Sequence, residues 1–180
     1  FPSRGDRWLL AITSVALAAC SDEPSGLRKM PTPKPHASSA VNVIMVTNKS
    51  GGMDVGSLRW AASSGFGGTI QFDPSLAADS ILLESTVVVD RNKIIEGPAD
   101  KGITIKMPYY TGRVIHVPNG ASLTVRNATI TGGSSDRGSG ILSEGFVPLT
   151  LEHTTVRGNS GGSAAIEGYD VILLNSTVSG

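Results

Sequence analysis

Three short blocks in the second half of the sequence share one pattern of apolar and polar positions. They are 123–132 (LTVRNATITG), 149–158 (LTLEHTTVRG) and 171–180 (VILLNSTVSG). Apolar residues alternate with polar ones in each block, which is typical of strands with one buried face. Successive blocks start at residues 123, 149 and 171, a spacing of 26 and then 22 residues. This spacing predicts a solenoid whose coils each contain three short strands.

The aligned blocks place apolar residues above one another. Leu123, Leu149 and Val171 share the first column. Stacked coils hold equivalent residues about 4.8 Å apart, so these columns are expected to form continuous apolar ladders in the core. Thr129, Thr155 and Thr177 share another column, and the blocks close on Gly.

The fifth column is polar and holds Asn127, His153 and Asn175. It resembles the asparagine ladder of right-handed β-helices, in which side-chain amides hydrogen-bond along the stack. His153 can take the same structural role because an imidazole both donates and accepts. The predicted fold class is therefore all-β, a right-handed single-stranded parallel β-helix. In the fourth column, Arg126 and Glu152 are expected to form an exposed salt bridge worth at most about 1 kcal/mol.

The same alternation continues upstream with longer turns. Further strands are predicted at 68–73, 81–83, 87–90, 93–96, 103–106 and 114–117. Before them, 56–62 (GSLRWAA) reads as one short helix with Ser57 as its N-cap. This helix is expected to cap the β-helix and shield its first coil.

The N-terminus has the pattern of an export signal. Arg4 and Arg7 precede the uncharged stretch 8–19, which as a helix would rise only about 18 Å and is too short to span a bilayer. The stretch leads into the sequence LAAC, which resembles the bacterial lipobox and implies cleavage before Cys20 and lipidation of that cysteine. Several acyl chains would give a stable membrane anchor, and Ser21 favours the outer membrane.

Three regions follow from these signals. Residues 1–19 are predicted to be the lipoprotein signal peptide, and 20–40 the lipidated cysteine with a disordered tether rich in Pro and Ser. Residues 41–180 are predicted to form the β-helix domain, which we expect to continue beyond Gly180. The last coil would expose an unpaired strand edge, which predicts self-association there.

Composition excludes some functions. Fifteen basic residues balance fifteen acidic ones, so nothing indicates nucleic-acid binding. Cys20 is the single cysteine, which excludes an intramolecular disulfide and metal clusters built on thiolates.

Three segments resemble the opening of pectin-lyase-like β-helix proteins: 46–48 (VTN), 56–61 (GSLRWA) and 68–74 (GTIQFDP). That superfamily includes secreted pectate lyases and bacterial surface proteins with a Ser-Leu-Arg-Glu-Ala motif. The resemblance covers 41–180 and concerns the cap and first coils, so it implies fold more than activity. Trp60 stands where the surface-protein motif has Glu. The calcium ligands and catalytic arginine region of pectate lyases have no counterpart.

One pair of carboxylates is a candidate site. Glu144 and Glu167 are 23 residues apart, about one coil, and are expected to stack. Two carboxylates about 5 Å apart repel unless a cation or a shared proton intervenes, so the pair predicts calcium binding or acid/base chemistry. The alternative is that both side chains extend into solvent beside a turn. No catalytic or cofactor-binding residue is assigned.

The lipobox, the tether and the lack of an assembled active site favour a surface-anchored lipoprotein that binds glycans or other cell-envelope partners. Its expected location is the bacterial outer membrane or cell surface. The alternative is a polysaccharide lyase or glycoside hydrolase of the pectin-lyase-like superfamily. A purely structural stalk is the third interpretation.

Overall fold

The computed structural model describes residues 42–108 and 112–180. The predicted signal peptide (1–19), Cys20 and the predicted tether (20–40) lie outside the described residues.

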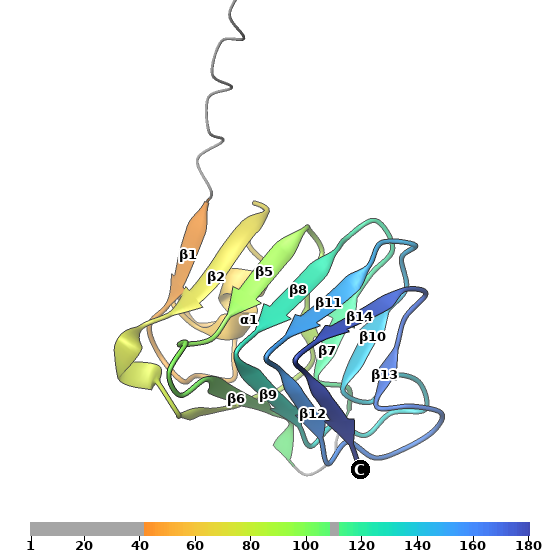
Figure 1. Cartoon of the computed structure of the whole chain (residues 1–180). Helices are drawn as coiled ribbons and strands as arrows, with labels where there is room; N and C mark the ends of the chain where they lie inside the picture. Colours follow the sequence, from red (N-terminus) through yellow and green to blue (C-terminus); the bar gives the residue numbers. More distant parts are fainter. Residues whose placement is uncertain (1–41, 109–111) are drawn as a thin grey trace, which may run out of the picture. The chain divides into compact units, whose positions relative to one another are not determined.

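The described part of the chain is a parallel β-solenoid of about five turns with three sheets (Figure 1). Sheet A contains β1 (Val43–Val46), β2 (Gly68–Phe72), β5 (Lys93–Glu96), β8 (Leu123–Arg126), β11 (Leu149–Glu152) and β14 (Val171–Leu174). Sheet B contains β3 (Ser80–Leu82), β6 (Ile103–Lys106), β9 (Ala128–Thr131), β12 (Thr155–Arg157) and β15 (Thr177–Ser179). Sheet C contains β4 (Val87–Val88), β7 (Ile115–Val117), β10 (Ile141–Ser143) and β13 (Ile166–Glu167). The predicted all-β parallel solenoid is confirmed.

The core is built from columns of inward side chains that run from coil to coil. In sheet A, Ile70, Ile95, Val125 and Leu151 are paired in register, and all four are fully buried. The predicted column Leu123–Leu149–Val171 is confirmed by the strand register. In β14 the inward Val171 and Leu173 are 36% and 45% exposed, because no described coil covers them.

The predicted cap is also confirmed. Helix α1 (Leu58–Ala62) has Ser57 as its N-cap, whose hydroxyl accepts a hydrogen bond from the Trp60 backbone N–H at 3.2 Å. Leu58 and the two alanines of α1 are fully buried, and the helix packs against β1, β2 and β4. Since Trp60 has no carboxylate, the N-cap works without the reciprocal bond of a capping box.

Some elements differ from the sequence prediction. Strands β1, β10 and β13 were not predicted, and a 3-10 helix, η1 (Pro74–Leu76), follows β2. The missed strands of sheet C have three and two residues. A run that short cannot display an alternation with period two, and Gly- and Ser-rich sequence surrounds both strands. The third face was therefore missed at β10 and β13, whereas the predicted strands at 87–90 and 114–117 match β4 and β7 of the same sheet.

Lys93 is a charged side chain in an inward position. It lies in register between Gly68 and Leu123 and is only 3% exposed. Its ammonium donates hydrogen bonds to the Ser64 carbonyl at 3.2 Å, to the Ser64 hydroxyl at 3.0 Å and to the Phe66 carbonyl. Lys93 thus ties the segment that follows α1 to the coil beneath it, which satisfies a buried charge with three oxygen atoms.

Replacing Lys93 should loosen the cap. Lys93→Met keeps the apolar stem but removes three part-buried hydrogen bonds, so we expect a loss of about 1–3 kcal/mol in the free energy of unfolding. Urea unfolding followed by circular dichroism measures it. The exposed Lys101 provides the control, because Lys101→Met should change stability by no more than about 0.5 kcal/mol. Equal stabilities of the two variants would contradict this role for Lys93.

Candidate functional site

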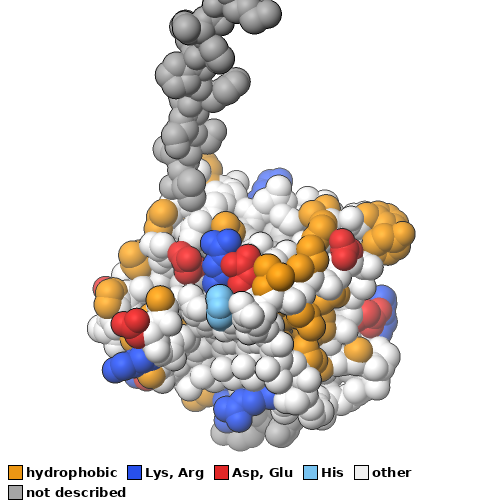
Figure 2. Space-filling view, in the orientation of Figure 1, with side chains coloured by type: hydrophobic (Ala, Val, Ile, Leu, Met, Phe, Trp, Pro, Cys, Tyr) orange, Lys and Arg blue, Asp and Glu red, His pale blue; other side chains and the backbone are white. Residues whose placement is uncertain are grey.

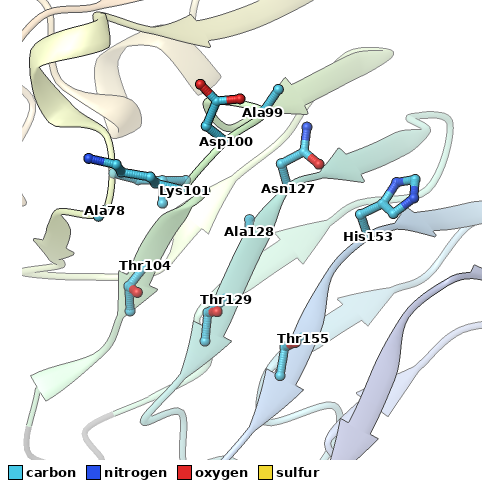
Figure 3. A pocket seen from close by; sticks show the side chains of 12 residues that line it. Ala78, Ala99, Asp100, Lys101, Thr104, Asn127, Ala128, Thr129, His153 and Thr155 are labelled. Atoms are coloured by element: carbon cyan, nitrogen blue, oxygen red, sulfur yellow. The ribbon is translucent and has the colours of Figure 1, made fainter.

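An open cleft of about 400 Å³ lies on the outer face of sheet B. Figure 3 shows its side chains on neighbouring strands, with Thr104, Thr129 and Thr155 side by side and Asn127 and His153 along the adjoining turn. The loop between β5 and β6 forms one rim and carries Asp100 and Lys101. Three successive coils therefore contribute to one concave surface.

The floor of the cleft is a ladder of hydroxyl groups. The strand register aligns Ser80, Thr104, Thr129, Thr155 and Thr177 on β3, β6, β9, β12 and β15. Neighbouring rungs are about 4.8 Å apart, as parallel pairing dictates. Within the described residues, the hydroxyls of Thr104, Thr129 and Thr155 make no hydrogen bond to protein. We call this row the threonine ladder, and its hydroxyls are available to a ligand.

The turn from sheet A to sheet B carries the second polar row. Asn127, His153 and Asn175 all have a left-handed backbone, with φ of 50°, 49° and 50°. Few residues other than glycine adopt this conformation readily, and asparagine is among the most tolerant. The left-handed backbone at this turn is thus a second reason why Asn recurs there, in addition to the side-chain hydrogen bonding that the sequence predicted.

The hydrogen bonds of this row are long. The Asn127 amide donates to the Gly97 carbonyl at 3.4 Å, and the Asn175 amide lies 3.4 Å from Nε2 of His153. A bond between Asn127 and His153 is not among the hydrogen bonds of the described residues. The three side chains are therefore aligned, but they are only weakly hydrogen-bonded to one another. Asn127 and His153 face the cleft.

The outer face of sheet A carries a row of paired charges. The predicted Arg126–Glu152 salt bridge is confirmed, with 2.7 Å between Nε and Oε2. Arg126 also lies 3.8 Å from Glu96, which accepts a hydrogen bond from the Gln71 amide at 2.8 Å. Figure 2 shows acidic and basic side chains side by side on this face. The hydrogen bond to Glu152 raises the pKa of Arg126, and these mutual contacts give the row a structural role.

The expected stacking of Glu144 and Glu167 is wrong. The register of β10 and β13 pairs Ile141 with Ile166 and Leu142 with Glu167. The local coil is therefore 25 residues long (166 − 141), whereas the two glutamates are 23 apart (167 − 144). Glu167 consequently lies beside Leu142, two positions before Glu144.

Each of these glutamates has its own basic neighbour. Nε2 of His116 lies 3.1 Å from a carboxylate oxygen of Glu144, although the contact lacks the alignment of a hydrogen bond. Arg137 donates to Glu167, with Nε 2.8 Å from Oε1, and the Ser163 hydroxyl adds a bond of 3.3 Å. The Arg137 hydrogen bond holds the pKa of Glu167 below its usual range.

A metal site is not assembled at these residues. Within 42–108 and 112–180, no three side chains of His, Cys, Asp or Glu are grouped as metal ligands would be. Calcium binding by Glu144 and Glu167 stays a prediction of the sequence, and the register removes the stacking on which that prediction depended.

Comparison of the chain with models of protein families, with curated proteins and with solved structures finds no match in any of the three. No helix in the described part of the chain is long and apolar enough to span a membrane.

Sequence reasoning found part of the cleft. It aligned Thr129 with Thr155 but assigned the column no role, and it placed Asn127 and His153 in a structural ladder. Thr104 and the rim residues were missed because they lie outside the three aligned blocks. The signal that could have found the cleft is the Asn-x-Thr or His-x-Thr spacing, which puts both polar rows on one edge of each coil.

The Arg137–Glu167 pair can be tested by titration. The pKa of Glu167 should lie below the ordinary glutamate value, because Arg137 stabilises the charged carboxylate. In Arg137→Gln it should rise towards that value, as followed by NMR of the side-chain carboxyl carbon. A Glu167 titration that does not move in the variant would contradict the pairing.

Proposed function

We propose that the cleft on sheet B binds an extended glycan that lies across successive coils, along the axis of the solenoid. The observation that carries this proposal is the threonine ladder with its free hydroxyls, beside the aligned Asn127 and His153. A repeating polar surface is complementary to a repeating polar ligand.

The chemistry of the two rows suits sugar hydroxyls. Threonine hydroxyls, the asparagine amide and the neutral imidazole ring each offer both a donor and an acceptor. Sugars present the same dual groups on successive units. Because the rungs recur at about 4.8 Å, each coil can repeat the contacts that its neighbour makes. The cleft spans three coils, from Thr104 to Thr155.

The lining of the cleft favours binding over cleavage. Glycoside hydrolysis ordinarily uses two carboxyl groups that flank the scissile bond. Among the described residues that line the cleft, Asp100 is the single carboxylate. The proposal is therefore a glycan-binding protein rather than a glycoside hydrolase.

We also propose that the solenoid is displayed on the bacterial cell surface as a lipoprotein of pectin-lyase-like type. The support is the sequence: the lipobox that ends at Cys20, the Pro-rich tether, and the cap segments that resemble that superfamily. A tethered solenoid would present sheet B to polysaccharides of the envelope or the surroundings.

Removing hydroxyls from the ladder should weaken glycan binding. We expect Thr129→Val and Thr155→Val each to lower affinity about five- to tenfold, because one hydrogen bond contributes about 1–1.5 kcal/mol. An array of neutral and acidic linear polysaccharides identifies the ligand, and calorimetry then measures the affinity. Thr150→Val is the matched control, because Thr150 is a half-buried outward threonine on β11 of sheet A.

The outcomes of this experiment separate clearly. A ligand whose binding is weakened by the two sheet B variants and unaffected by Thr150→Val supports the proposal. Failure of every polysaccharide on the array, or an equal loss in the Thr150 variant, overturns it.

Lipid anchoring is tested separately on the full chain in a Gram-negative host. We expect Cys20 to incorporate labelled palmitate and the protein to sediment with membranes, whereas Cys20→Ser should lose the label. Ser21→Ala is the control and should keep both properties. Label in the Cys20 variant, or none in the unaltered protein, would refute the lipobox interpretation.

A further inference from the structure

A column in which basic and uncharged residues alternate runs beside the threonine ladder. On the same outer face of sheet B, two residues further along each strand, the register aligns Leu82, Lys106, Thr131, Arg157 and Ser179. Lys106 and Arg157 are exposed, and the coil between them carries the neutral Thr131. Basic residues therefore occupy alternate coils.

Both basic side chains lack an acidic partner. The salt bridges of the described residues involve other cations, and neither Lys106 nor Arg157 forms one. Arg126 and Arg137, by contrast, are each paired with a glutamate. The charges of Lys106 and Arg157 are thus unneutralised and available to an anionic ligand.

The opposite side of the ladder carries one acidic and one basic residue on its rim, Asp100 and Lys101, beside the uncharged amide of Asn127. Lys106 and Arg157 therefore supply unpaired positive charge on the outer face of sheet B beside the cleft, and they are two coils or about 9.6 Å apart along the stack.

We propose that the cleft selects a linear acidic polysaccharide with one acidic group on every second sugar. This inference rests on the proposed glycan-binding function. A pyranose unit of an extended chain advances by roughly one coil, so every second unit meets Lys106 or Arg157. The unit between them meets Thr131, where a carboxylate would find no cation.

Three octasaccharides of equal length test the inference. They are an alternating glucuronate–N-acetylglucosamine oligomer, an oligogalacturonate and a neutral N-acetylglucosamine oligomer. We expect the alternating oligomer to bind about tenfold more tightly than the neutral one and several-fold more tightly than the oligogalacturonate, at low salt. Lys106→Gln and Arg157→Gln should each weaken the alternating oligomer about three- to fivefold, because exposed ion pairs are individually weak. Arg91→Gln removes an exposed charge between β4 and β5, away from sheet B, and should have no effect.

A gain-of-function variant gives the sharper readout. Thr131→Lys places a cation on the intervening coil and should raise affinity for the oligogalacturonate about threefold, so that the preference for the alternating oligomer narrows. Equal binding of all three oligomers, with Thr129→Val still weakening them, would overturn the charge inference and leave the glycan-binding proposal standing. Binding of none of them, together with failure of the full array, would remove both.

Discussion

Parallel pairing of each coil with the next sets the position of every side chain that matters in this molecule. Backbone hydrogen bonds hold the strands in register, so a residue on β8 has a fixed neighbour on β5 and on β11. Inward, this register builds the buried column Ile70–Ile95–Val125–Leu151. Outward, it builds the threonine ladder and the charge row around Arg126. The same register therefore fixes both the core and the surface, because a slip by one residue would turn inward side chains outward and outward side chains inward.

The turn between sheets A and B links this constraint to the candidate site. Asn127, His153 and Asn175 bend the chain through a left-handed conformation, and the following strand begins within two residues. The turn residue and the second residue after it consequently meet at one edge of the coil. Because each coil bends in the same way, the polar edges line up into the cleft. The unpaired cations of Lys106 and Arg157 lie on the same face of sheet B, two residues further along their strands.

The sequence predicted the parts of the fold whose pattern is long enough to be read. The alternation in the three blocks predicted their strands, the core column through Leu123, and the Arg126–Glu152 pair, and the Ser57 cap followed from helix chemistry. Strands β10 and β13 of sheet C, with three and two residues in Gly- and Ser-rich sequence, carry too few positions to show a period. The stacking of Glu144 and Glu167 failed because coil length varies with the turns, being 25 residues at that point. The cleft could not be predicted from the sequence, because its rim comes from a loop outside the repeated blocks.

The modular register also bears on how such a chain can evolve. Every coil brings its own rung to the threonine ladder and its own inward residue to each core column. In-frame duplication or loss of one whole coil would lengthen or shorten the binding surface while leaving its chemistry unchanged. The turns already absorb differences of a few residues, since neighbouring coils are 26 and 22 residues long in sheet A. The reach of the surface can therefore change by unequal recombination of whole coils without a new substitution.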